Sequence, residues 1–274
     1  MPSSYPLVSI SHGSASRVAV VALLAVGLGA AVTAKAQAPA DGEPSFPTWG
    51  LGLGVMSEQE PYAGIGRDNT PLPLLQFENR YIHLFGPRIE FKLPGLDIGD
   101  SQQLNFGIVG QYDGSGYEED DAPILNGMAK RRGGFWAGAA VEWSSSFVDI
   151  SAEWLADASG NSNGQVVSLG LERTWQLGKR VLLTPHVGAS WQDENYVDYY
   201  FGVRESEARL DRPAYIGESA VNIEAGVRGV YMFDRHHSVL MGGEVTGLAD
   251  EIKDSPLVDR STTNSLYLGY LYRF

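Results

Sequence analysis

The sequence predicts an all-β protein, a transmembrane, antiparallel, up-and-down β-barrel of about twelve strands, with ten strands as the alternative. Three observations predict it. The chain begins with an export signal, its strands are long and have one apolar face, and its connections alternate between short and long. The composition agrees, because 33 glycines, 13 tyrosines, 10 phenylalanines and 6 tryptophans suit a β protein with many turns.

Charge and cysteine content exclude several classes of function. Acidic residues number 33 against 20 basic ones, for a net charge of −13, and phosphate binding needs a basic face. Nucleic acid is therefore not an expected partner. The absence of cysteine excludes disulfides, cysteine-ligated zinc and thiol catalysis.

The first residues are typical of a secretory signal peptide. Arg17 precedes the apolar run Val18–Val32, and Ala34-Lys35-Ala36 offers a small-x-small cleavage site. A membrane anchor is the alternative, but the run is shorter than the roughly 20 residues of a spanning helix. We therefore predict a signal peptide at 1–36, a short periplasmic segment at 37–48 and an outer-membrane barrel at 49–274.

The strands are recognised by period-2 alternation, which leaves one face apolar. In Leu104–Tyr112, for example, Phe106 and Ile108 alternate with Asn105 and Gly107. Eight segments show the pattern clearly: 103–113, 134–143, 147–157, 165–177, 181–193, 218–233, 237–248 and 263–274. Four shorter ones in the N-terminal third complete the count: 49–56, 71–78, 80–85 and 88–93. The long segments match the roughly 9–11 residues that a tilted strand needs to cross a bilayer.

The polar and apolar faces favour a membrane barrel over a soluble sandwich. The polar face mixes small residues with charged ones such as Glu153 and Arg228, which can pair in a wet lumen. The apolar face ends repeatedly in aromatic rings, as in the girdles of outer-membrane barrels. Arg173 is an exception on the apolar face. It must either lie at an interface or mark a bulge that shifts the register.

The connections alternate in length when counted back from the C-terminus, which is periplasmic in such barrels. Long joints are predicted at 249–262, 194–217 and 113–133, a moderate one at 157–164, and short ones at 234–236, 178–180 and 144–146. Short periplasmic turns and longer outer loops are expected of this architecture. The long joints are therefore predicted to face the exterior.

The chain ends on an amphipathic strand in which Tyr270, Tyr272 and Phe274 share the apolar face and Ser265 lies on the other. This ending resembles the C-terminal signal that the barrel assembly machinery recognises. The predicted contacts are therefore that machinery and outer-membrane lipid. An ordinary amphipathic strand at the chain end is the alternative.

Four stretches together resemble the MipA/OmpV family, the MltA-interacting proteins of Gram-negative outer membranes. They are Pro71–Leu74, Tyr199–Val203 leading through Glu207-Ala208 to Tyr215, Asp254–Val258, and Leu268–Phe274. The resemblance covers nearly all of the mature chain. The tyrosine-rich stretch and the Asp-Ser-Pro stretch are its more specific parts.

The resemblance implies a structural scaffold in the cell envelope that links a murein-cleaving lytic transglycosylase to a bifunctional murein synthase. Some relatives are described instead as osmotically regulated or adhesive surface proteins. The family has no established catalytic residues, so none is transferred to this chain. A partner-binding motif is not matched residue by residue either.

A candidate contact for periplasmic partners comes from the two short turns that carry basic residues. These are Lys179 and Arg180 in one turn and Arg235, His236 and His237 in the other. They form a basic set on an acidic protein. The alternative is that they border anionic lipid or remain solvated.

Enzymatic activity, a cofactor and a metal site are not expected. His186 and Ser190 share a strand face, but residues four apart on a strand lie about 13 Å apart, too far for a catalytic dyad. The acidic run Glu118–Asp121 lacks a calcium-loop spacing and is interpreted as a solvated outer loop near Lys130–Arg132. A small cation-preferring pore is the other alternative function, because acidic residues are predicted in the lumen.

Overall fold

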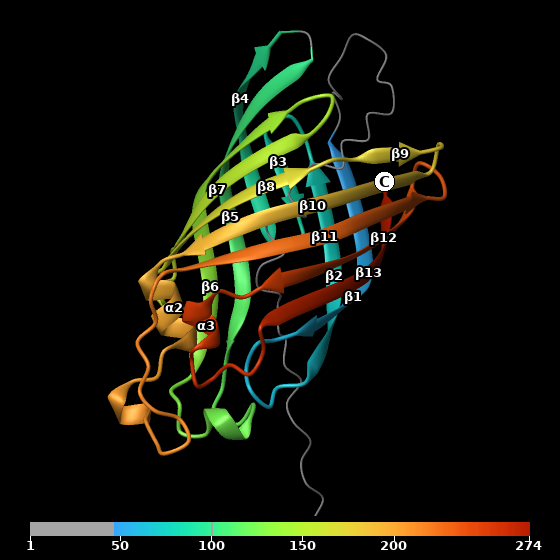
Figure 1. Cartoon of the computed structure of the whole chain (residues 1–274). Coiled ribbons are helices and arrows are strands. Elements are labelled where there is room, and N and C mark those ends of the chain that lie inside the picture. Colours follow the sequence, from blue (N-terminus) through green and yellow to red (C-terminus); the bar gives the residue numbers. More distant parts are fainter. Residues whose placement is uncertain (1–46, 100) are drawn as a thin grey trace, which may run out of the picture.

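The computed structural model describes residues 47–99 and 101–274, and its strands form one closed antiparallel barrel (Figure 1). In chain order the strands are β1 (Thr48–Gln59), β2 (Arg67–Glu78), β3 (Ile82–Phe85), β4 (Arg88–Ile98), β5 (Gln102–Tyr117), β6 (Arg131–Ser144), β7 (Asp149–Asp157), β8 (Gln165–Glu172), β9 (Trp175–Leu177), β10 (Val181–Gln192), β11 (Ala220–Met232), β12 (His237–Gly247) and β13 (Thr262–Arg273). The helices are η1 (Pro123–Leu125), α2 (Glu194–Phe201), η2 (Glu205–Glu207) and α3 (Asp250–Lys253).

The barrel has twelve strands, as predicted, because β8 and β9 are two parts of one strand. Both pair with β10 in one continuous register, Glu172 opposite His186 and Trp175 opposite Leu183. The ladder is interrupted where Arg173 faces Pro185, which has no N–H to donate. No bulge therefore shifts the register. Arg173 is exposed with its guanidinium 5.8 Å from the Trp175 ring centre, and its place at an interface stays a prediction.

Five strands (β1, β2, β4, β5 and β6) are longer than the sequence pattern predicted, and β2 and β4 differ in instructive ways. β2 begins at Arg67 because its first residues pair with the end of β1. β4 continues to Ile98, so the predicted strand end at residue 93 is wrong. The register shifts between Leu93 and Leu96, where a Cβ on Gly95 would lie 2.8 Å from the Leu104 carbonyl oxygen. Pro94 and Gly95 thus form a bulge, where the prediction had taken them as a strand end.

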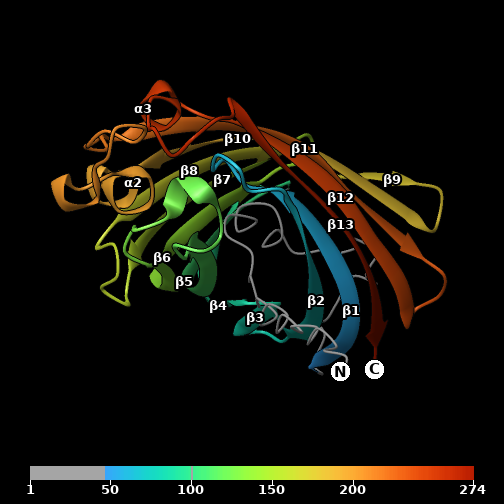
Figure 2. The same ribbon diagram turned by 90° about the horizontal axis from the view of Figure 1, so that it is seen from below.

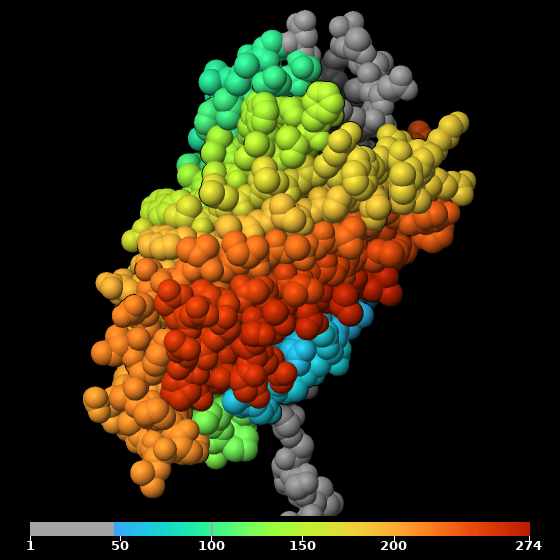
Figure 3. Space-filling model, in the orientation of Figure 1, coloured from blue at the N-terminus to red at the C-terminus, as the bar shows by residue number. Residues whose placement is uncertain are grey.

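The predicted alternation is confirmed, because the apolar face points outward. Leu53 is 74% exposed, Ile223 58% and Leu268 53%, whereas Ser265, on the opposite face of β13, is 8% exposed. The strands from β8 to β13 form an unbroken outer surface (Figure 3). This band of apolar side chains suits the hydrocarbon core of a membrane.

The first and last strands close the barrel. β1 pairs with β13 from Gly50 opposite Arg273 to Gln59 opposite Asn264, and the Phe274 N–H donates to the Trp49 carbonyl over 2.9 Å. The two backbones approach closely, since a Cβ on Gly52 would lie 2.1 Å from the Tyr270 carbonyl oxygen. Only glycine fits there.

The two ends of the barrel differ as the loop lengths predicted. The cap end, which carries the long connections and the four helices of the described residues, is at the bottom of Figure 1. The turn end, where β13 finishes, carries the short turns at 145–148, 178–180 and 233–236. The helices themselves were not predicted. α2 begins where the Asp193 carboxylate accepts the Tyr196 N–H over 2.9 Å, an N-cap contact.

Inward-facing side chains form three levels along the barrel axis. At the cap end an apolar cluster joins barrel residues such as Trp136 and Leu155 to the loops. At the turn end a second cluster lies inside the wall of β2 and β10–β13, formed by Leu74, Leu182, Val230, Leu240 and Leu271. Ion pairs occupy the level between them.

The predicted signal peptide and nearly all of the predicted segment 37–48 lie outside the described residues. Within residues 47–99 and 101–274, no helix has the length and apolar character needed to cross a membrane.

We expect Phe274→Asp to reduce assembly of the barrel severely, because it removes the terminal ring of the candidate assembly signal. Phe233→Asp is the matched control, since Phe233 is another exposed aromatic residue at the turn end, 51% exposed against 67% for Phe274. The measurement is the amount of heat-modifiable protein in outer membranes. Equal losses for the two variants would assign Phe274 to the aromatic girdle alone.

Candidate functional site

The structure brings the five predicted basic residues together along one part of the turn end. The two turns are adjacent because β10 pairs with β11, and the Met232 N–H donates to the Arg180 carbonyl over 2.7 Å. Lys179, Arg180 and Arg235 are exposed. These three side chains form a set that we call the basic rim.

The two histidines of the predicted set are held against the C-terminal strand. The His236 Nδ1 donates to the Arg273 carbonyl over 2.8 Å, and its ring stacks on Tyr272 with centres 5.9 Å apart. The His237 Nδ1 contacts the Tyr270 hydroxyl. The two histidines therefore bind this turn to β13. The basic rim accordingly consists of Lys179, Arg180 and Arg235.

Asp234 shapes the same turn. Its carboxylate accepts the backbone N–H groups of His237 and His236, each over 2.8 Å, and these bonds lower the pKa of Asp234. The carboxylate therefore remains ionised beside Arg235. The two turns that carry the basic rim therefore bear charges of both signs, with an excess of cations.

The candidate assembly signal forms an aromatic row at the same end. Tyr272 and Phe274 meet edge to face with ring centres 5.0 Å apart. Tyr270 is 43% exposed on the outer face of the same strand. The row is placed where a lipid interface favours rings, and its part in assembly stays a prediction.

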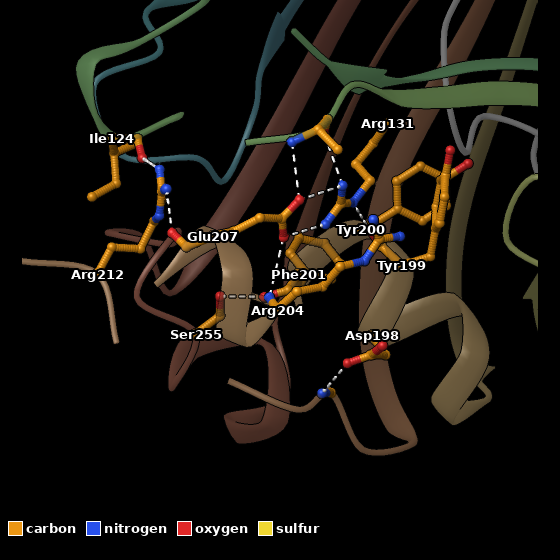
Figure 4. A network of polar contacts seen from close by, with 12 residues as sticks. Ile124, Arg131, Asp198, Tyr199, Tyr200, Phe201, Arg204, Glu207, Arg212 and Ser255 are labelled. Atoms are coloured by element: carbon orange, nitrogen blue, oxygen red, sulfur yellow. Dashed lines mark hydrogen bonds and ion pairs between the residues drawn. The ribbon is translucent and has the colours of Figure 1, made fainter. Parts of the chain in front are cut away.

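At the cap end the long loops are joined by Glu207, whose side chain is 5% exposed (Figure 4). Its carboxylate accepts a bidentate pair of bonds from Arg131, over 2.9 and 3.2 Å. It also accepts the backbone N–H groups of Ala129 and Arg204, over 2.9 and 3.1 Å. One carboxylate thus joins the connection before β6 to the connection after β10.

These contacts control the ionisation of Glu207. Burial alone would raise its pKa, but the bonds from Arg131, Ala129 and Arg204 outweigh burial and lower the pKa to about 2. Arg131 is 2% exposed on its side chain, and its guanidinium also donates to the Tyr199 carbonyl over 2.7 Å. The pair is buried and fully ionised at neutral pH.

Arg212 connects the same loops from the other side. It is 1% exposed, and its guanidinium donates to the carbonyls of Ile124 and Glu207, the latter over 2.6 Å (Figure 4). Arg209 adds bonds to the carbonyls of Pro123 and Asn126. The η1 and η2 segments are therefore bound to each other mainly through the guanidinium groups of Arg209 and Arg212, of which that of Arg212 is buried.

Two of the four stretches that carried the family resemblance, the tyrosine-rich stretch and the Asp-Ser-Pro stretch, meet in this cap. Tyr196 and Tyr200 of α2 lie against each other, and Tyr196 packs on Trp136 of the barrel wall with ring centres 5.8 Å apart. The Ser255 hydroxyl of the Asp-Ser-Pro stretch donates to the Phe201 carbonyl over 2.6 Å. The tyrosine-rich stretch is therefore a packing surface that fixes the loops over the barrel.

The middle level of the lumen is charged. Arg88 pairs with Glu153 and Arg228 with Glu172, while the His186 Nε2 lies 3.0 Å from a Glu244 carboxylate oxygen. Further nitrogen and oxygen atoms of these residues are buried without a protein partner among the described residues: Arg88 Nε, Glu153 Oε1, His186 Nδ1 and Arg228 Nη1. Buried polar groups usually have hydrogen-bond partners, so the ion pairs account for only part of the polar capacity of this level.

The other polar groups singled out in the sequence have structural partners. His186 pairs with Glu244 on β12, and the acidic run is tied to its own loop by an ion pair between Glu118 and Lys130. In the described part of the chain, no three His, Asp or Glu side chains are grouped so as to hold a metal ion.

A closed barrel with an apolar outer band, aromatic rings at its turn end and a charged lumen defines an outer-membrane β-barrel. The chain belongs to the family described as MltA-interacting protein MipA, which matches residues 51–274. The protein is thus an outer-membrane barrel of the Gram-negative envelope, as predicted.

Two relatives and one solved structure are similar to this chain over most of its length. The chain is 27% identical over 225 residues to the outer membrane protein YiaT of Escherichia coli, covering 82% of this chain and 90% of the relative. It is 26% identical over 229 residues to the MltA-interacting protein of Escherichia coli, covering 82% and 89%. An outer membrane channel from Pseudomonas putida aligns with a TM-score of 0.41 and 15% identity, covering 86% and 99%.

We expect Glu207→Gln to loosen the cap while leaving the barrel folded. Removing one partner of a buried ion pair leaves the other uncompensated, at a cost of about 3–5 kcal/mol. The measurement is limited trypsin cleavage in the 204–218 segment. Glu205→Gln is the control, because Glu205 is an exposed glutamate of the same η2 turn. Equal cleavage of the two variants would contradict the assigned role.

The same pair predicts a pH dependence. Because the Glu207 pKa is lowered from 4.5 to about 2, its contribution is present above pH 4.5 and is lost as the pH falls toward 2. Pepsin should therefore cut the wild-type cap near pH 2 and spare it near pH 4. The Glu207→Gln cap should be cut at both values, so resistance of that variant at pH 4 would count against the mechanism.

We expect the cap end to face the cell exterior, which follows from a periplasmic C-terminus. Tags inserted at Asp120 and Leu210 test this, because both residues are exposed at loop tips and Leu210 is 107% exposed. Insertions at Ser115 or Ser206 are unsuitable, since Ser115 lies in β5 and Ser206 adjoins Glu207. Antibody should label intact cells. Labelling that requires a permeabilised outer membrane would invert the topology.

Proposed function

We propose that the barrel is a structural scaffold that holds periplasmic murein-remodelling enzymes at the outer membrane. The partners would be a lytic transglycosylase and a bifunctional murein synthase. The observation that supports this is membership of a family described by interaction with MltA, together with the similarity to the MltA-interacting protein of Escherichia coli.

The basic rim would be the docking surface for such a partner. Lys179, Arg180 and Arg235 are exposed on adjacent turns of a chain whose net charge is −13. A periplasmic partner with an acidic face would be attracted to these turns specifically, because the rest of the chain repels it. Such exposed charges act chiefly on the association rate and weaken with salt.

The filling of the lumen also favours a scaffold over an open channel. Apolar side chains occupy the inner wall at both ends, and the helices of the cap pack on the wall at the cap end. Twelve strands enclose a lumen that side chains can largely fill, whereas open channels use about 16–18 strands. A barrel filled in this way would serve as a membrane-embedded platform with a small periplasmic surface.

The test is affinity capture from detergent-solubilised envelopes, followed by mass spectrometry. Wild-type barrel should recover a lytic transglycosylase or a murein synthase. Replacing Lys179, Arg180 and Arg235 by Gln should weaken recovery about tenfold at low salt and less at high salt, as expected of rim charges. The control replaces Lys130, Arg132 and Arg204, three exposed cations of the cap end, by Gln.

Equal recovery by the two triple variants would remove the basic rim from the proposal. A cation-preferring pore is the second candidate, supported by the carboxylates of the middle level, among them Glu153, Glu172 and Glu244. Large cation-selective conductance in planar bilayers, with no murein enzyme captured, would favour that pore over the scaffold.

A further inference from the structure

Arg173 is a cation on the lipid-facing surface of the barrel. On that face it lies between Leu171 and Trp175, which are 45% and 44% exposed. Its guanidinium makes no ion pair or hydrogen bond with any described residue and lies against the Trp175 ring. The adjacent carboxylate, that of Glu172, is turned to the lumen, where it pairs with Arg228. A lipid-facing arginine without a protein partner requires a partner from its surroundings.

The local structure indicates that Arg173 lies at the edge of the membrane. Residues 173–180 are all exposed, including Thr174 and Gln176 on the inward face, so the strand leaves the packed wall here. The ladder also breaks at this point, because the Arg173 N–H donates to the Pro185 carbonyl over 3.3 Å and proline has no N–H to return. A lipid-facing arginine is tolerated near an interface and is unfavourable at the bilayer midplane.

The position of β9 in the barrel agrees with this level. Figure 1 shows β9 at the end of the barrel that carries the C-terminus, and Figure 2 shows its hairpin with β10 at the periphery of the barrel. Trp175 is the first residue of β9, and tryptophan is enriched in the aromatic girdles at membrane interfaces. The Arg173 guanidinium therefore lies at the level of lipid head groups.

The chemistry of this surface fits the phosphate group of a membrane lipid. The contact with Trp175 leaves the N–H groups of the guanidinium without acceptors, and a guanidinium binds phosphate oxygens through two parallel hydrogen bonds. Next to Arg173, the paired outward side chains of Ile150, Leu171 and Val187 are 37%, 45% and 50% exposed. They offer an apolar surface to acyl chains. A phosphate that carries acyl chains therefore matches this surface better than a free phosphate ion.

The charges nearby favour a lipid with a net negative charge. Lys179 and Arg180 are exposed at the tip of the same hairpin, and basic residues at a membrane surface attract anionic lipids. Ethanolamine and choline head groups also carry an ammonium group, and the outward neighbours Ile150, Leu171 and Trp175 offer it no carboxylate. The expected ligand is therefore an anionic glycerophospholipid without an ammonium group.

We propose that Arg173 and Trp175 form a binding site for the phosphodiester of an anionic glycerophospholipid in the leaflet at the turn end. The phosphate accepts hydrogen bonds from the Arg173 guanidinium, and the acyl chains lie along Leu171 and Val187. The site gives a physical reason for a cation in an otherwise apolar row of side chains. It depends neither on docking at the basic rim nor on passage of ions through the lumen.

The test is native mass spectrometry of the detergent-solubilised barrel titrated with phosphatidylglycerol, with phosphatidylcholine of the same acyl chains as the reference lipid. Arg173→Leu removes the guanidinium and continues the apolar row, so the barrel should still fold, and heat-modifiable migration checks this. Arg173→Gln replaces that variant if it fails. Arg180→Gln is the matched control, because it removes one exposed cation from the tip of the same hairpin.

We expect Arg173→Leu to weaken binding of the first phosphatidylglycerol about tenfold, as for the loss of charge-assisted hydrogen bonds to phosphate. Arg180→Gln should weaken it about twofold at most, because an exposed charge contributes little. Equal losses for the two variants would reduce the effect to general attraction and overturn the site. Equal binding of both lipids by the wild type would overturn the anionic preference. Displacement of the lipid by inorganic phosphate would assign the site to free phosphate and overturn the lipid as its ligand.

Discussion

Backbone hydrogen bonding in a solvent without water is the constraint on which the structure depends. Every N–H and C=O group in the membrane must find a partner inside the protein, and a closed sheet is one of two solutions. Closure here is completed by the pairing of β1 with β13, with Phe274 bonded to Trp49. Phe274 thus completes the ladder between β13 and β1. Closure of the barrel therefore depends on the C-terminal sequence as well as on the number and length of the strands.

The same constraint explains the residues of β2 beside the short strand β3, where β2 has no further strand partner among the described residues. β3 ends after four residues, and the exposed edge of β2 carries Pro71 and Pro73. Proline is unfavourable in a central strand but costs little at an edge, because no donor is lost there. The Pro-Leu-Pro-Leu sequence, which first served only as part of a family resemblance, thus has a local physical reason.

The cap depends on a different kind of interaction. Glu207 and Arg131 are 76 residues apart and form a buried pair, while Arg212 binds η1 to η2. A buried ion pair contributes specificity more reliably than stability, because desolvation offsets much of the attraction. The pair therefore suits a role in which it selects one arrangement of long loops over the barrel. The turn end, by contrast, is held by short turns and keeps its cations exposed.

The sequence by itself determined the features that repeat at short range. The alternation in Leu104–Tyr112 and similar segments placed the strands and their two faces, because in every strand lipid-facing residues alternate with lumen-facing ones. The lengths of the connections distinguished the two ends of the barrel. The tertiary structure alone decided which distant groups meet: Glu207 with Arg131, His236 with Tyr272, and Ser255 with Phe201. It also decided that β3 stops early and that α2 and α3 form inside loops. Those outcomes depend on contacts between residues tens of positions apart, and local patterns carry no information about which partner a buried side chain will find.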